Sequence, residues 1–505
     1  MLLDRYTFYR GFIALVAAMI AGVMFGSWLP MSPNDRARWD TVWSLVDFNT
    51  YQIFDTKAEA EKWGKPEQWE TIDKVARKFT GPDGKEELKF YSSKPPLLPT
   101  VAAGVVKGMQ YVGKAMHVLG PSFQHLGGPI TKEDRGKPTV GNSSIYFKPT
   151  LMLFNLVPFL VFLGMYRRHL DRETSTDFAW YVCIIVAALG SLSTGYLTTF
   201  NNHSIAAHFA GMTLLLLWPI WHDGRRDAWR FALAGLCAGW TAANELPAAA
   251  FALACLVFSL SRAFLSALVF FLPPFVLVVW AFFYTNEQSF GSKIPAYLQP
   301  EMYDYPDSYW RKSDKSAIDA LSTPRDDGTY VEGPRVAGEF TRKVKAFIKP
   351  EAEGDAAKPS GLFVSPHYLL HMTFGHHGLF SLTPIWIFAF IGLFAALFED
   401  RGWRLLSSWM LFFIVLVTFA FYWMVNTERN YGGYCHGMRW LLWLTPIWLL
   451  YLPRMLDALS NSRFGRMLVW IAVGISIFSV ADTWPNPWHY SWLHRILIWC
   501  GAVGY

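Results

Sequence analysis

Long apolar runs separated by charged turns make up most of the chain. About 20 consecutive apolar residues in a helix cross the hydrocarbon core of a bilayer. Runs that approach or reach this length lie at residues 9–29, 148–166, 177–199, 205–221, 231–260, 263–284, 380–398, 405–424, 438–453 and 467–481. The pattern predicts an all-α integral membrane protein, because a helix satisfies its own backbone hydrogen bonds in lipid.

Basic residues concentrate in alternate turns between these runs. They are Arg5, Arg10, Arg167, Arg168, Arg172, Arg225, Arg226, Arg230, Arg262, Arg401, Arg404, Arg454, Arg463 and Arg466. The intervening turn at residues 201–204 contains none. Because basic turns stay on the cytoplasmic side, we expect a cytoplasmic N-terminus and a location in the cell (inner, cytoplasmic) membrane. No cleavage site is clear after the first run, so we expect that run to remain as a helix.

The run at 231–260 needs a separate interpretation, because the basic turns on both sides of it belong to the same side of the membrane. The chain must therefore cross and return within this run. Asn244-Glu245-Leu246-Pro247 lies in its middle, and a proline ends a helix at or before the preceding residue. We expect two short helices with Glu245 at the tip, which makes a bundle of about eleven transmembrane helices.

Two long polar segments fall on the outer side of this topology. The expected organisation is a first transmembrane helix (1–29), a first outer loop with juxtamembrane helices (30–147), transmembrane helices two to seven (148–284), a second outer loop (285–379), transmembrane helices eight to eleven (380–481) and an outer aromatic tail (482–505). Residues 97–119 read as an interfacial helix, since a span here would invert every later basic turn. Two large loops on one face predict a site at the outer surface.

Composition narrows the chemistry. The chain is 52% hydrophobic and 17% charged, and its net charge of +6 comes largely from turns that topology explains, so no nucleic-acid partner is expected. The five cysteines show no metal-ligand spacing. His367 and His371 could form a metal pair on one helix face, but no acid or cysteine accompanies them. We expect no metal ligands and no required cofactor, with the need for a divalent metal left open.

Three polar motifs stand at the outer ends of the predicted helices. The first loop opens with Asn34-Asp35-Arg36-Ala37-Arg38 and later contains Tyr91-Ser92-Ser93-Lys94-Pro95-Pro96-Leu97. The third is Asn430-Tyr431-Gly432-Gly433 through Gly437-Met438-Arg439-Trp440. With this topology, the motifs resemble those of the GT-C superfamily of polyprenyl-phosphate-sugar-dependent glycosyltransferases. The protein O-mannosyltransferases and the lipid A aminoarabinose transferases are the most similar branch.

The resemblance implies a catalytic carboxylate soon after the first helix, which would be Asp35. The chain departs from the family in having Arg36 where a second acid often follows, and Ser93 where the aminoarabinose branch has an acid before the lysine. A carboxylate can take the proton of an attacking acceptor, and cations stabilise the departing phosphate. The candidate phosphate-binding residues are Lys94, Arg439, Arg36 and Arg38.

Each of these residues also has a structural interpretation. Asp35 could be the N-cap of a short helix at 36–46. Lys94 and Arg439 could anchor the chain at lipid headgroups. Asp40 and Asp47 are expected to be solvated or paired with arginine. Residues that could line the site wall are Glu245, Asn201, Asn202, His203, Tyr91, His376 and His377, although Glu245 could hold its hairpin and the polar turn at 201–203 could be only a turn.

The sequence thus predicts a membrane glycosyltransferase that moves a sugar from a polyprenyl-phosphate donor to an acceptor on the non-cytoplasmic face. Expected partners are the polyprenyl-phosphate-linked sugar, membrane lipids and a lipid, glycan or protein acceptor. The alternative is a transporter or flippase of lipid-linked or anionic substrates. The glycosyltransferase hypothesis requires Asp35, Lys94 and Arg439 to converge at the outer surface, with Glu245 or Asn202 beside them.

Overall fold

The computed structural model describes residues 4–26, 32–53, 71–80, 84–116, 143–305, 366–425 and 431–501. Within these residues, seven helical segments are long and apolar enough to cross a membrane. Three of them are single helices: α1 (Arg5–Gly26), α10 (Asn202–Asp223) and α22 (Arg463–Thr483). Two more are Tyr146–Glu173, which contains most of α6 (Ser143–Leu151), η3 (Met152–Leu156) and α7 (Val157–Glu173), and Asp177–Thr198, which contains α8 (Asp177–Leu189), α9 (Leu192–Gly195) and η4 (Tyr196–Thr198). The last two are Phe264–Phe290, which contains α13 (Phe264–Ser266), η6 (Ala267–Phe271) and α14 (Leu272–Phe290), and Gly402–Met424, which contains α20 (Gly402–Ala420) and most of η9 (Phe421–Val425).

Four shorter helical segments occupy the remaining predicted runs. They are α11 (Ala228–Asn244), η5 with α12 (Leu246–Ala248 and Ala249–Arg262), α19 (Ile385–Glu399) and η10 with α21 (Arg439–Leu444 and Thr445–Leu459). The all-α multi-pass class is therefore confirmed. The expected break inside 231–260 is also present, because α11 ends at Asn244 and Pro247 lies in the 3-10 turn η5. A proline there cannot continue the hydrogen-bond ladder of α11.

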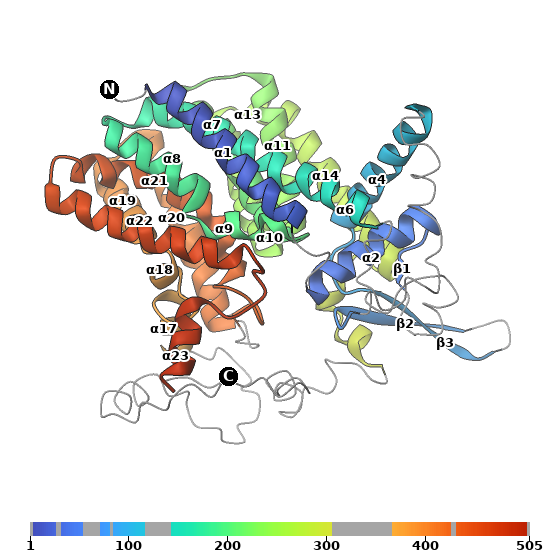
Figure 1. Cartoon of the computed structure of the whole chain (residues 1–505). Coiled ribbons are helices and arrows are strands. Elements are labelled where there is room, and N and C mark those ends of the chain that lie inside the picture. The colour runs from blue at the N-terminus through green and yellow to red at the C-terminus, as the bar shows by residue number, and fades with distance from the viewer. Residues whose placement is uncertain are drawn as a thin grey trace.

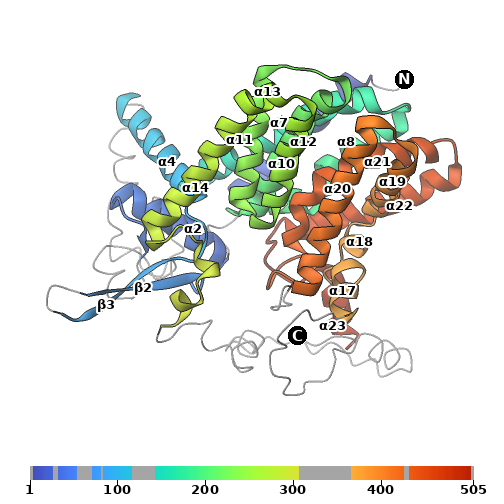
Figure 2. The ribbon, with the colours of Figure 1, turned by 180° about the vertical axis from the view of Figure 1, so that it is seen from behind.

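Helix α10 is the centre of the bundle. Of its most apolar 18-residue stretch, 94% is buried, against 17% for α1. Helices α1 and α8 lie on the face of the bundle seen in Figure 1, and α11, α12 and α14 lie on the face seen in Figure 2. Close approach depends on small residues, since a Cβ on Gly211 would lie 2.4 Å from the ring of Phe162 and one on Gly235 would lie 2.1 Å from the carbonyl oxygen of Phe271.

The turns rich in arginine meet at one end of the bundle. Arg5 Nε lies 2.7 Å from Asp177 Oδ1, and Arg404 Nη1 lies 2.9 Å from Glu173 Oε2. Arg226 Nη2 donates to the carbonyl oxygen of Arg262 at 3.0 Å. We call this the basic end; it comprises residues 173–177, 223–228, 262–264, 399–404 and 454–463. The start of α10, the end of α11 and the start of η10 lie at the opposite end, which we call the site end.

A small domain built from the first loop lies at the site end (Figure 1). It contains α2 (Pro33–Asp47), α4 (Leu97–Met116) and three antiparallel strands in the order β1 (Gln52–Ile53), β3 (Glu86–Ser92), β2 (Lys74–Thr80). The sequence analysis did not predict this sheet. Helix α4 occupies most of the stretch expected to be interfacial. On one face of the sheet Val75 pairs with Tyr91, and this face packs on Phe290, Ala296 and Met302.

Short helices from the C-terminal half form a second group. They are α17 (Pro366–Thr373), α18 (Leu379–Leu382) and α23 (Trp492–Trp499), which gather below α22 in Figure 1. The described part of the expected aromatic tail contains the short helix α23. His436 N donates to the carbonyl oxygen of Pro487 at 2.9 Å, which ties the segment before η10 to the segment before α23.

Candidate active site

Asp35 sits in the first turn of α2 with its side chain buried. Ser32 is the N-cap: its hydroxyl accepts from Asp35 N at 3.1 Å, and Asp35 Oδ2 accepts from Ser32 N at 3.2 Å. This reciprocal capping box corrects the idea that Asp35 is itself the N-cap, because Pro33 already begins the helix. Oδ2 also accepts from Trp488 Nε1 at 3.0 Å. Oδ1 is buried and has no hydrogen-bond partner among the described residues.

The buried environment of Asp35 raises the pKa of its carboxyl group. Burial raises the pKa of this carboxyl from 3.8 to about 6, although the charge of Arg38 and hydrogen bonds from Ser32 and Trp488 act in the opposite direction. A carboxyl with a pKa near 6 is largely ionised at neutral pH and still basic enough to accept a proton. That combination suits a general base.

Arg38 lies one helical turn after Asn34 and joins α2 to the transmembrane helices. Its guanidinium donates to the side-chain oxygens of Asn34 and Asn202, and burial lowers its pKa to about 10. Asn202 in turn donates to Glu245 Oε1 at 2.8 Å and to the carbonyl oxygen of Asn244 at 2.7 Å. His203 Nδ1 contacts the same carboxylate oxygen of Glu245. The chain of contacts fixes Arg38 against the start of α10 and the end of α11.

Lys94 follows strand β3 and reaches towards the same place. Its Nζ lies 3.1 Å from Asp73 Oδ1, and the carbonyl oxygen of Asp73 accepts from Ser93 N at 2.9 Å. Burial lowers the pKa of Lys94, while the Asp73 carboxylate opposes that shift. The positive charges of Arg38 and Arg439 lower it further, so the three cations share one electrostatic neighbourhood.

Arg439 is the first residue of η10, and part of its guanidinium group has no described hydrogen-bond partner. Its Nε and Nη1 are buried and have no hydrogen-bond partner among the described residues. The guanidinium carbon lies 4.9 Å from the ring centroid of Trp488, whose indole N–H bonds to Asp35. Gly432 leaves room for the side chain: with φ at +101°, it is a position where a Cβ would lie 2.9 Å from Arg439 Cγ and Nε.

The structure brings Asp35, Arg38, Lys94 and Arg439 together at the site end, beside Asn202 and Glu245. We call these residues, with Asp73 and Trp488, the charged cluster. Trp488 touches both Asp35 and Arg439, and Arg38 lies within the electrostatic reach of Asp35, Asp73, Arg439 and Glu245. Arg36 is half-buried next to Asp35, and its pKa is lowered by burial. The cluster thus combines a buried carboxyl with cations that can meet an anion.

Other candidate residues have different surroundings. Tyr91 is buried in the core between the sheet and Phe290. Asn201 is the N-cap of α10, since its side chain accepts from Ser204 N and donates to the carbonyl oxygen of Tyr196. His376 and His377 stack with Tyr431 and His494, in a group that shares no described contact with Asp35 or Lys94. The side chain of His367 lies outside the described residues.

Sequence reasoning missed three members of the site. Asn34 was quoted only as part of a motif, Asp73 stands in a polar stretch, and Trp488 lies 453 residues after Asp35. The only available signal for Asp73 was an acid just before a short run with strand-forming residues. Nothing local in the sequence distinguishes Trp488 from the other tryptophans of the tail.

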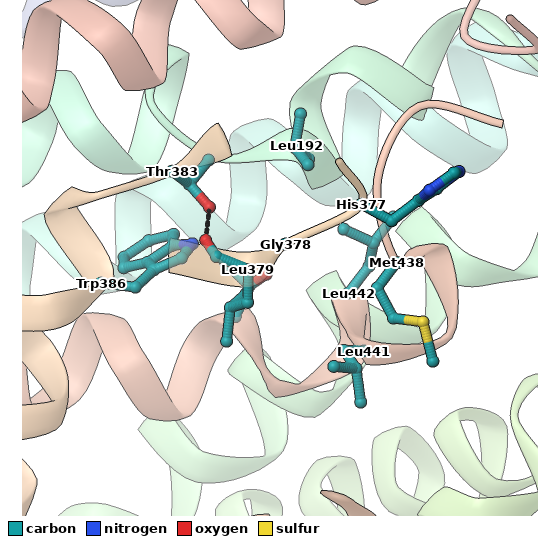
Figure 3. A pocket seen from close by; sticks show the side chains of 10 residues that line it. Leu192, His377, Gly378, Leu379, Thr383, Trp386, Met438, Leu441 and Leu442 are labelled. Carbon is teal, nitrogen blue, oxygen red and sulfur yellow. Dashed lines mark hydrogen bonds between the residues drawn. The ribbon is translucent and has the colours of Figure 1, made fainter. Parts of the chain in front are cut away.

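Two groups of described residues could hold a metal ion: His376, His377 and His494, and His436, Asp482 and His489. Neither includes Asp35, Asp73 or Glu245. A small apolar pocket borders the first group, lined by Leu192, Met438, Leu441 and Leu442, with His377 at one side (Figure 3). In the same view Thr383 donates to the carbonyl oxygen of Leu379 at 2.6 Å. The pocket is too apolar to receive a phosphate.

Comparisons with known proteins find distant likeness in structure alone. No protein-family model and no curated protein matches the chain. Among solved structures, it is similar to the archaeal oligosaccharyltransferase AglB from Archaeoglobus fulgidus in complex with an inhibitory peptide and a dolichol-phosphate, with 13% sequence identity and a TM-score of 0.43. The likeness covers 96% of this chain and 57% of that chain. The chain therefore spans little more than half the length of this neighbour.

Proposed function

We propose that the protein is a membrane glycosyltransferase that uses a polyprenyl-phosphate sugar, with the charged cluster as its active site. The observation that carries the proposal is the pairing, around Trp488, of a buried carboxyl whose pKa is about 6 with a guanidinium whose buried donors have no partner. Buried groups with unused bonding capacity usually mark functional sites. The motif resemblance in the sequence points to the same activity.

The cations of the cluster suit a phosphate monoester or diester. Arg439 offers a planar fork with Nε and Nη1 available, and a guanidinium fork matches two phosphate oxygens. Lys94 adds a point charge from a different segment of the chain, and its charge is paired with that of Asp73. The prenyl chain would lie along apolar helices such as α14, whose Leu277 and Trp280 side chains are more than half exposed.

The reaction needs one proton acceptor and one stabilised leaving group. As the acceptor oxygen or nitrogen forms its bond to the anomeric carbon, its proton passes to Asp35 Oδ1. The bond between the anomeric carbon and the phosphate oxygen breaks, and its electron pair remains on the phosphate. Arg439 and Lys94 stabilise the added negative charge, which is larger in the transition state than in the bound donor. Arg38, held by Asn34 and Asn202, orients α2 and adds positive potential.

A transporter or flippase of lipid-linked substrates is the second candidate. The interruption at Glu245 favours it, because transporters place their sites on broken helices. Such sites lie near the bilayer midplane, whereas Arg38, Lys94 and Arg439 lie at the site end. The two functions differ in chemistry, since only a transferase converts the polyprenyl-phosphate sugar to polyprenyl phosphate.

The deciding experiment incubates the purified protein in lipid nanodiscs with a polyprenyl-phosphate sugar labelled in the sugar, together with an acceptor-rich membrane extract. Thin-layer chromatography and mass spectrometry then follow the label and the lipid. The proposal expects release of polyprenyl phosphate and label on an acceptor, both absent for Asp35→Asn. Unchanged donor with label crossing a sealed bilayer would instead support transport.

A further inference from the structure

Three buried histidines, His376, His377 and His494, come together from two distant segments of the chain. One ring nitrogen from each of His376, His377 and His494 lies within 4.8 Å of the others. The rings of His376 and His494 stack with centroids 4.2 Å apart, and the Nδ1 atoms of His376 and His377 face each other in contact. The three rings can therefore offer one ligand nitrogen each to a shared metal ion.

The backbone around these rings is fixed by a single serine. Ser491 is the N-cap of α23: its hydroxyl accepts from His494 N at 3.1 Å and donates to the carbonyl oxygen of His376 at 2.6 Å. The Tyr431 ring stacks on His377 with centroids 4.8 Å apart. The histidines are therefore brought together by protein contacts, as a preorganised ligand set requires.

The ring nitrogens have the chemical form that binds metals. His377 Nε2 is buried and has no hydrogen-bond partner among the described residues, which costs free energy unless something else bonds to it. A metal binds the lone pair of an imidazole nitrogen, and His377 Nε2 is placed to offer one.

The second histidine group differs in two of its three members, His489 and Asp482. The ring nitrogens of His489 face the carbonyl oxygens of Tyr490 at 2.6 Å and Asp482 at 3.0 Å. His489 Nε2 faces a carbonyl oxygen, so it carries the proton that it donates and offers no lone pair, while Nδ1 also lies 3.0 Å from Arg495 Nη1. Asp482 is bound by Arg495 at 2.7 Å. In the group at His436, Asp482 and His489, two of the three candidate ligands are thus engaged by other partners, and the group serves as an internal comparison.

We propose that His376, His377 and His494 bind a Zn²⁺ ion, which joins the segment before α18 to helix α23. Zinc accepts three imidazole nitrogens in tetrahedral geometry and leaves a fourth position for water. Magnesium and calcium prefer oxygen ligands and fit this set poorly. The bound ion would fix the ring of His377, on which the ring of Tyr431 stacks. Because Gly432 is the next residue after Tyr431, the ion would also help to hold Gly432 beside Arg439. This site is separate from the proposed chemistry, and it can be present whether or not the protein transfers sugar.

The test measures metal directly on the full-length protein, purified with a tag that contains no histidine. Inductively coupled plasma mass spectrometry should find about one zinc per chain after stripping with a chelator and reloading with Zn²⁺. X-ray absorption at the zinc edge should show nitrogen ligands with imidazole scattering. Reloading wild-type protein with Co²⁺ should give the intense visible bands of a tetrahedral site, and metal should raise the thermal midpoint.

Variants locate the ion. His377→Gln and His494→Gln should each lose most of the bound zinc, whereas the matched His436→Gln should keep it. The reverse pattern, or sulfur and oxygen ligands in the absorption spectrum, would overturn the assignment. Wild-type protein that takes up neither Zn²⁺ nor Co²⁺ would overturn it too, and this arm needs no variant, so poor folding of a substituted chain leaves the question answerable.

Discussion

The two ends of the helical bundle carry similar kinds of charge and use them differently. At the basic end Arg5, Arg404 and Arg454 each meet a carboxylate at 2.7–3.0 Å. At the site end Arg439 keeps Nε and Nη1 buried without a described partner, and Asp35 does the same with Oδ1. Paired charges at the basic end hold turns together. At the site end, buried groups without a described hydrogen-bond partner can bond to a substrate. This property distinguishes a candidate binding site from the structural ion pairs of the basic end.

The largest expected effect comes from removing the base. Asp35→Asn should lower transfer by about a hundredfold or more, the range for losing general-base assistance. Donor binding should survive, because the proposed phosphate contacts are with Arg439 and Lys94. Initial rates with a labelled donor, at matched expression, measure the effect. The matched control is Asp457→Asn at the basic end, where Asp457 accepts from Ser175 and Thr176; its rate should stay within about twofold.

The next largest effect is expected when one arginine at each end of the bundle is replaced with glutamine and the two variants are compared. Arg439→Gln should lower kcat/KM by about tenfold to a hundredfold, since a hydrogen bond to a charged group contributes about 1.5–3 kcal/mol. Both donor affinity and kcat should fall, because the phosphate is charged in the ground state and more so in the transition state. Arg404→Gln, which breaks the half-exposed pair with Glu173, should leave both constants unchanged. Equal losses in the two variants would erase the distinction between the ends.

The acidity of Asp35 predicts a pH dependence. Because the pKa of this carboxyl is about 6, kcat/KM should be level above pH 7 and should fall about tenfold per pH unit well below 6. Rates measured from pH 4.5 to 8 with a constant-ionic-strength buffer show the inflection. Residual transfer by Asp35→Asn should lack it. An inflection that persists in that variant would assign the base to another residue, such as Asp40, Asp47 or Glu245.

The smallest effect is on stability. The pKa of Asp35 is raised in the folded protein, so its favourable contribution is fully present below 3.8 and is lost as pH rises through about 6. The free energy of unfolding of wild-type protein relative to Asp35→Asn should therefore decline between pH 4 and pH 6, by a total on the order of 3 kcal/mol, which thermal unfolding at a series of pH values measures. A difference that grows with pH in this window would mean that Asp35 is stabilised as an anion.

Sequence reasoning reached the membrane helices because their signals are local. Apolar runs of spanning length and alternate basic turns determined all eleven helical segments, and Pro247 marked the break before α12. The sheet was missed because β2 is only seven residues long and carries three basic residues, so it shows no clear apolar alternation. The N-cap was misplaced by three residues, since Ser32-Pro33 is the stronger start signal.

The partners of the site residues were beyond reach of the sequence for a different reason. Asp35 meets Trp488 across 453 positions, and Arg38 meets Asn202 across 164. Such contacts depend on how α2 docks on the bundle, which no local pattern encodes. Lys94, Arg439 and Asn202 could be nominated because their types and outer positions suit phosphate and sugar chemistry. Asp73 could not, since its carboxylate acquires meaning only beside Lys94.

The most direct test is a cryo-electron microscopy structure of the protein in nanodiscs with a polyprenyl phosphate added. The account predicts density for the phosphate in hydrogen-bond contact with the Arg439 guanidinium and the Lys94 ammonium, on the side of Trp488 that faces Asp35. The prenyl chain should leave the cluster between transmembrane helices. A phosphate bound at Arg225 and Arg226 of the basic end, with the charged cluster empty of lipid, would contradict the central claim.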